Sequence, residues 1–208
     1  MAIPTTLNNT QQLLEKALSQ AISYDDYRAM VSQLAIEGKS TGPNQTEALA
    51  NYTMLNDRRM KRFDKTVKLS DEHVAQIAKL GKKLQLIVLT ESWCGDAAPA
   101  LPVINKVAQL NEHIDFKVVL RDENIDLMNQ FLTNGGMSIP KLIFWDRENQ
   151  EVLADWGPRP EPAAKLVADH KAKHGTLLPE IKEDLQQWYN KDKGQTMLKE
   201  LLARLPLK

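Results

Sequence analysis

The stretch from Leu84 to Pro102 constrains the fold most, because it passes from a buried strand to a helix within a few residues. Leu84–Thr90 is apolar at nearly every position and rich in β-branched residues, which predicts a central strand covered on both faces. Alanines and apolar residues at helical spacing then predict a helix from residue 97. Cys94, the only cysteine of the 208 residues, lies at this junction. Because unpaired N–H groups at a helix N-terminus favour a thiolate, Cys94 is a candidate nucleophile.

The turn Trp93-Cys94-Gly95 after this strand resembles the active-site turn of the thioredoxin family. Pro102 stands eight residues after the cysteine, where thioredoxins have the proline that kinks the active-site helix. The pair Ile139-Pro140 is similar to the pair whose cis-proline packs beside the cysteine. The order of the three landmarks makes the resemblance specific for the fold. It implies an α/β protein with a thioredoxin-like central mixed sheet flanked by helices.

The chain departs from the family pattern at three positions within the stretch that resembles it, residues 80–175. Asp96 stands where the family has a proline, and Ala97 stands where it has the second, resolving cysteine. Val88 stands where thioredoxins keep a buried aspartate that accepts a proton. The motif is therefore Trp-Cys-Gly-Asp-Ala in place of Trp-Cys-Gly-Pro-Cys, and any thiol chemistry has a single cysteine.

Composition removes several classes of function. Lys and Arg together number 27, as do Asp and Glu, so no net basic field attracts nucleic acid. We expect no membrane association, because the chain has neither a long uncharged apolar run nor a basic and then apolar leader. One cysteine forms neither an internal disulfide nor the usual four-ligand zinc site. We therefore expect a cytoplasmic protein without a metal or a cofactor.

Helical patterns flank the thioredoxin-like stretch on both sides. We predict a helical N-terminal extension at residues 1–80, a thioredoxin-like domain at 81–175, and a helical C-terminal extension at 176–208 that packs on the same domain. Within the domain, a helix is predicted over residues 124–133 and is stopped by two glycines. The apolar stripes of the C-terminal helices favour docking on the core, and a homodimer built on the last helix remains open. Side chains suited to cap helix starts are Ser23, Asn44 or Thr46, and Ser70.

By the resemblance, Cys94 is the catalytic residue of the predicted site. The backbone of Ile139 would offer its N–H and C=O groups to an extended peptide. Asp96 has two predicted effects, because its carboxylate can cap the helix and its charge opposes the thiolate and raises the pKa of the cysteine. The residues expected to bind substrate are Trp93, Gly95, Asp96, Ile139 and Pro140.

Arg121 is a candidate supporting residue. It follows the strand predicted at residues 114–120, at the edge of the sheet where sites collect. Its charge could hold a thiolate or a ligand carboxylate near Cys94. A salt bridge to Asp122 or Glu123 is the simpler interpretation, and we favour it.

Two functions from different classes remain open. In the first, Cys94 exchanges with a disulfide of a protein or small-molecule partner, and an external thiol resolves the product because Ala97 cannot. In the second, the protein is a non-catalytic binding module that uses the groove between Trp93 and Pro140. We favour monothiol exchange, because the polar residues of the turn argue against a fully buried thiol. A cysteine protease is disfavoured, since no matching His or Gln context accompanies Cys94.

Three further patterns carry weaker functional interpretations. Gly38-Lys39-Ser40 lacks the first glycine and the preceding strand of a phosphate-binding loop. The basic cluster at residues 58–62 favours a solvated helix end, with an anion or acidic-partner site as the alternative. His170 and His174 share a predicted helix face, but no acidic partner completes a metal site.

Overall fold

The computed structural model of the chain describes residues 8–207. The expectation about a leader falls partly on positions 1–7, which lie outside the described residues. Its centre is a four-stranded sheet with the strand order β2-β1-β3-β4. The strands are β1 (Leu84–Thr90), β2 (Ile114–Leu120), β3 (Lys141–Asp146) and β4 (Glu151–Trp156). β1 runs parallel to β2 and antiparallel to β3, which pairs antiparallel with β4. The predicted mixed sheet is therefore confirmed.

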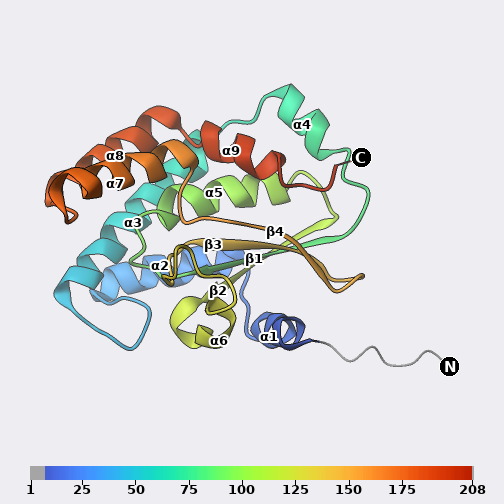
Figure 1. Ribbon diagram of the computed structural model, residues 1–208, viewed down its shortest axis with the longest axis horizontal. Helices are drawn as coiled ribbons and strands as arrows, with labels where there is room; N and C mark the ends of the chain where they lie inside the picture. Colours follow the sequence, from blue (N-terminus) through green and yellow to red (C-terminus); the bar gives the residue numbers. More distant parts are fainter. Residues whose placement is uncertain (1–7, 208) are drawn as a thin grey trace.

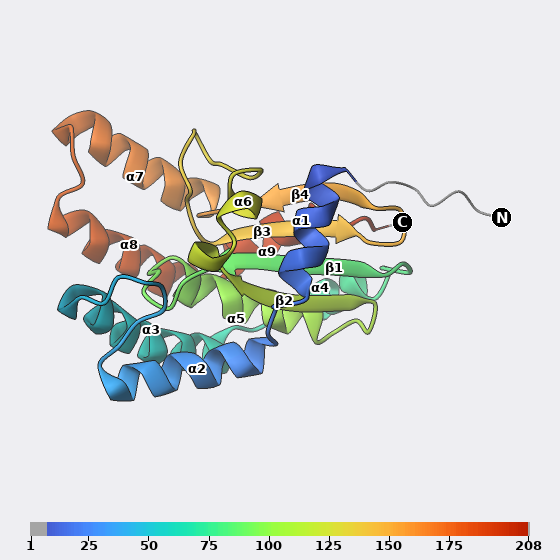
Figure 2. The same cartoon turned by 90° about the horizontal axis from the view of Figure 1, so that it is seen from below.

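Helices cover both faces of the sheet (Figure 1, Figure 2). Their bounds are α1 (Asn9–Leu18), α2 (Tyr24–Glu37), α3 (Glu47–Thr66), α4 (Asp71–Ile77), α5 (Ala97–Ala108), α6 (Ile125–Met128), α7 (Glu161–His174), α8 (Pro179–Asp192) and α9 (Gln195–Leu202). The larger layer holds α5 between α3 and α9, with α7 and α8 as a hairpin beside them, whereas α1 and α6 lie on the opposite face. No helix in the described range is long and apolar enough to cross a membrane.

Burial explains why β1 is a central strand. Every residue of β1 and of β3 is buried, as the continuous apolar run of β1 predicts. β4 lies at the edge of the sheet and keeps exposed and half-buried positions. The β1–turn–α5 unit is thus held inside the molecule between two helical layers.

Three helices begin at their predicted caps. The side chains of Ser23, Thr46 and Ser70 accept hydrogen bonds from backbone N–H groups in the first turns of α2, α3 and α4. The prediction of a helix over residues 124–133 is wrong, because only the short α6 forms there, after a 3-10 turn at Arg121–Glu123. After α6 the backbone makes i to i+3 hydrogen bonds, which tighten the chain into turns.

Both helical extensions bury apolar residues in the common core. In the N-terminal part, Leu14, Val31 and Phe63 are buried, and α3 packs along α5. α3 extends to Thr66, and Phe63 near its end belongs to this core. In the C-terminal part, the apolar stripe of α9 packs into the core of the same chain. Its buried residues are Met197, Leu198, Leu201 and Leu202. The boundaries at residues 81 and 175 stay a prediction.

Candidate functional site

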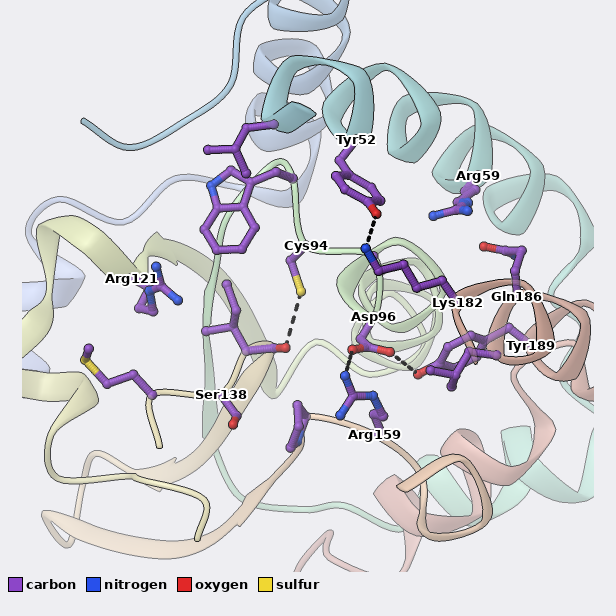
Figure 3. Close-up of a pocket in the computed structure, with 17 residues that line it drawn as sticks. Tyr52, Arg59, Cys94, Asp96, Arg121, Ser138, Arg159, Lys182, Gln186 and Tyr189 are labelled. Carbon is purple, nitrogen blue, oxygen red and sulfur yellow. Dashed lines mark hydrogen bonds and ion pairs between the residues drawn. The ribbon is translucent and has the colours of Figure 1, made fainter. Parts of the chain in front are cut away.

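Cys94 lies in a tight turn between β1 and α5, and its thiol is buried. The Cys94 N–H donates to the Glu91 carbonyl at 3.0 Å, which closes the turn. The residue is 6% exposed, and its Sγ donates a hydrogen bond to the Ile139 carbonyl oxygen at 3.2 Å (Figure 3). The expectation that the polar turn prevents full burial is wrong, because Cys94 joins the core that also holds Ala97 and Ile139.

This environment raises the pKa of the Cys94 thiol to about 12. Burial is the largest cause, and the charge of Asp96 adds to it. The backbone N–H groups of Ala97 and Asp96 and the charge of Arg159 act in the opposite direction but do not prevail. The helix N-terminus therefore fails to hold a thiolate here, and Cys94 is a neutral thiol at neutral pH.

Asp96 does not cap α5, which corrects one of its two predicted effects. Its backbone is already helical and its side chain makes no capping hydrogen bond. The carboxylate instead accepts a hydrogen bond from the Tyr189 hydroxyl at 2.9 Å and pairs with Arg159 at 2.6 Å. Burial raises the pKa of Asp96, and the charge of Arg159 opposes that shift. Its carboxylate thus belongs to an ion pair beside the thiol.

A pocket of about 520 Å³ opens over this turn (Figure 3). α3, the turn, the segment before β3, the segment after β4, and α8 contribute its walls. Of the predicted site residues, the pocket brings together Trp93, Cys94, Gly95, Asp96, Arg121 and Ile139. The residues that sequence reasoning missed include Leu49, Tyr52, Arg59, Met137, Ser138, Pro158, Arg159, Lys182, Leu185, Gln186 and Tyr189.

Four cations and one carboxylate line the pocket. The cations are Arg59, Arg121, Arg159 and Lys182, and the carboxylate is Asp96. Arg121 forms the predicted salt bridge, with 2.6 Å to Asp122. It also places its guanidinium 5.0 Å from the centre of the Trp93 ring, so it belongs to the pocket wall. Because only Asp96 supplies an acid, the pocket has an excess of positive charge.

Pro140 and Val88, two positions compared with the family pattern, do not line the pocket. The Ile139-Pro140 peptide bond is cis, as the resemblance implies. Pro140 itself is buried and is not among the pocket-lining residues, where Pro158 lies instead. Val88 is fully buried in β1. The groove is thus bounded by Trp93 and Pro158 rather than by Trp93 and Pro140.

Buried hydrogen bonds clamp the other side of the turn. Ser92 donates its N–H to Thr41 Oγ1 at 2.8 Å, and its hydroxyl lies 2.8 Å from Thr53 Oγ1. The Ser92 carbonyl accepts from Asn56 Nδ2 at 2.9 Å. The Glu91 carboxylate accepts from the Thr41 hydroxyl, and burial raises the pKa of Glu91. Thr41 and α3 therefore fix the backbone that precedes Cys94.

The donor set does not suit a metal. Among residues 8–207, no group of three or more His, Cys, Asp or Glu side chains is arranged to hold a metal ion. His170 and His174 stack on one another with ring centres 4.5 Å apart, and the His170 ring accepts from the Leu178 N–H. What the site offers is a neutral thiol, cationic side chains and apolar walls.

Comparisons with known proteins give one matching family and two similar folds. A family model described as thioredoxin matches residues 42–173. The fold is similar to a Pseudomonas aeruginosa protein of unknown function, PA1234, with a TM-score of 0.56 and 17% identity, covering 72% of this chain and 83% of that one. An HIV 4E10 epitope scaffold has a TM-score of 0.55 and 16% identity, covering 83% and 95% respectively. No curated protein matches the chain.

Proposed function

The chain belongs to the thioredoxin family, and from this premise we propose that it is a binding protein that holds a small anionic molecule over Cys94. The charge of the pocket carries the proposal, because four cations face one carboxylate around a neutral thiol. Low-dielectric walls focus such a field and raise the local concentration of anions. Binding, rather than catalysis by a resting thiolate, is what this arrangement favours.

The protonation of Cys94 argues against exchange in the resting protein. The thiolate is the nucleophile in disulfide exchange. With its pKa raised to about 12, Cys94 is almost entirely protonated at neutral pH. A thiol that donates to the Ile139 carbonyl acts instead as a neutral part of the pocket wall.

The size and lining of the pocket suit an organic molecule. Its volume of about 520 Å³ lies within the roughly 300–1,000 Å³ typical of small-molecule sites. Apolar side chains line it beside the cations, among them Leu49, Trp93, Met137 and Leu185. The ligand therefore combines an apolar body with an anionic group.

A pair of alkylating reagents tests this proposal directly on Cys94, the only cysteine. Iodoacetate and iodoacetamide attack the same thiolate but differ by one negative charge, so the ratio of their rates is independent of the pKa of Cys94. We expect this ratio to be about fivefold higher in the folded protein than in the urea-unfolded chain, because the pocket cations attract iodoacetate. An equal or lower ratio in the folded protein would overturn the proposal.

Monothiol exchange is the second candidate, and one observation favours it. The N–H groups of Ala97 and Asp96 and the charge of Arg159 all act to stabilise a Cys94 thiolate. In the reaction with 5,5′-dithiobis(2-nitrobenzoate), the Cys94 sulfur would form the new S–S bond and release one thionitrobenzoate. Release at the rate of the unfolded chain would favour exchange, whereas a rate about a hundredfold lower would favour binding. Cys94→Ser is the blank.

A further inference from the structure

We propose that the anionic group of the ligand is a phosphoryl group, held between α3 and α8 by Arg59 and Lys182. This inference rests on the proposed function and names the class of ligand. The argument comes from how the positive charge is distributed within the pocket.

Arg59 is a half-buried cation on which the charge of Asp96 acts from beyond ion-pair distance. Within residues 8–207, no carboxylate lies within ion-pair distance of its guanidinium, and its Nη1 donates to Asn56 Oδ1 at 3.2 Å. Burial lowers its pKa, as expected for a charge that lacks solvation. A Cβ built on Gly95 would lie 3.7 Å from Nη1, so the guanidinium stands beside the Cys94 turn. An anion bound there would compensate a partly desolvated charge.

Lys182 adds a second cation on the same side of the pocket. Its Nζ donates to the Tyr52 hydroxyl at 2.7 Å and lies 5.1 Å from the centre of the Tyr52 ring. In the described part of the chain it has no carboxylate within ion-pair distance. Figure 3 shows Arg59, Lys182, Tyr52 and Gln186 together between α3 and α8, so two charges and two polar groups gather at this end.

The other two cations of the pocket are already paired. Arg159 is 2.6 Å from Asp96, and Arg121 is 2.6 Å from Asp122. Among the pocket cations of the described residues, Arg59 and Lys182 are therefore the two without an ion pair, and together they carry two positive charges. A phosphate monoester carries about −1.5 to −2 charges at neutral pH and three acceptor oxygens, whereas a carboxylate carries one charge. Arginine also donates in the forked geometry that phosphate oxygens accept.

Phenyl phosphate and benzoate are the probes that separate the two anion classes. Both have an aromatic ring for the apolar wall formed by Leu49 and Leu185. Isothermal titration calorimetry on the full-length protein should give phenyl phosphate at least about tenfold tighter binding than benzoate, because two cations face the dianion. Arg59→Gln and Lys182→Gln should each weaken phenyl phosphate binding about tenfold.

Matched variants control for the loss of a charge. Arg58 is exposed on α3 next to Arg59, and Lys191 is exposed on α8, and neither lines the pocket. Arg58→Gln and Lys191→Gln should leave phenyl phosphate binding unchanged. Circular dichroism of all four variants should match the wild type, since none of the four side chains is buried in the core.

Three results would overturn this inference: no binding of phenyl phosphate, benzoate binding of equal strength, or equal effects of Arg59→Gln and Arg58→Gln. The ratio of alkylation rates judges the proposed function separately. A raised ratio with failed phosphate binding would leave the anion pocket standing and remove the phosphoryl assignment. An unchanged ratio would remove the proposed function itself.

Discussion

The two sides of the Cys94 turn are held by different kinds of interaction. Before the cysteine, Ser92 is fixed by hydroxyl and amide groups of Thr41, Thr53 and Asn56, all of which precede β1 in the chain. After the cysteine, Asp96 is held by an ion pair with Arg159 and by the hydroxyl of Tyr189. The first set is buried away from the pocket, whereas the second lines it.

This difference assigns separate roles to the segments before β1 and after β4. Neutral, buried hydrogen bonds fix geometry, because leaving any of them unmade costs the desolvation of the partner group. The pair of Asp96 with Arg159 changes the local field instead, since its two charges act in opposite directions on the pKa of Cys94. The residues before β1 therefore set the shape of the turn, whereas Asp96 and its partner Arg159 after β4 act on the pKa of Cys94.

Breaking the clamp should have the largest effect on stability. Thr41→Val removes the hydroxyl that serves both Glu91 and the Ser92 N–H. The Ser92 N–H and one Glu91 oxygen would lose their partner, while the other Glu91 oxygen keeps the Asp122 N–H. The free energy of unfolding should therefore fall by about 2–4 kcal/mol in urea titrations. The matched control is Thr66→Val on the exposed end of α3, where a change within about 0.5 kcal/mol is expected. Equal effects of the two substitutions would refute the clamp.

Breaking the ion pair should mainly change the chemistry of the thiol. Asp96→Asn removes the charge that raises the pKa of Cys94 and leaves the charge of Arg159 to lower it. The rate of alkylation by iodoacetamide at pH 7 should rise about tenfold, which corresponds to about one pKa unit. Asp126→Asn on α6 removes an equal charge from an exposed residue that does not line the pocket, and serves as the control. An unchanged rate in Asp96→Asn would show that the two groups are not coupled.

The raised pKa of Glu91, which accepts a hydrogen bond from Thr41, predicts a pH dependence of stability. Burial raises its pKa above the ordinary value of 4.5, so the native protein binds this proton more tightly than the unfolded chain does. As the pH falls from 7 toward 4.5, the wild type should therefore gain stability relative to Glu91→Gln. Urea titrations of both proteins across this range measure the difference. A difference that moves in the other direction would contradict the assignment.

Tyr189→Phe should have the smallest effect. It removes one hydrogen bond to Asp96 and leaves the ion pair with Arg159 in place. We expect a loss of about 1 kcal/mol in the free energy of unfolding, measured in urea. A loss as large as that of Thr41→Val would show that the two sides of the turn do not differ as described.

Local pattern predicted the β1–turn–α5 unit, whereas the pocket depended on contacts that no local pattern contains. The apolar run of β1 and the position of Cys94 follow from neighbouring residues alone. Arg59, Arg159 and Lys182 come from three segments far apart in the chain, and only tertiary packing brings them together. The basic cluster at residues 58–62 indicated an anion site as the alternative interpretation, but its pattern does not distinguish the half-buried Arg59 from its exposed neighbours.

Asp96 shows the limit of local rules most clearly. A carboxylate at a helix start is typical of a cap. The residue that decides its role is Arg159, which is 63 positions away and forms the ion pair at 2.6 Å. Arg159 acts in the same direction as the helix N-terminus on the pKa of Cys94, so the ion pair is not what keeps the thiol neutral. Burial and an acid beside the sulfur raise its pKa more than the helix N-terminus lowers it.

The central claim is that Cys94 is a neutral thiol in the wall of a binding pocket. A pH titration of thiolate absorbance near 240 nm tests it, with Cys94→Ser as the blank that removes the tyrosine signal. The account predicts no thiolate transition in the folded protein below pH 10, consistent with a pKa of about 12. A transition below the value of about 8.5 for a free thiol would contradict it and restore Cys94 as a nucleophile.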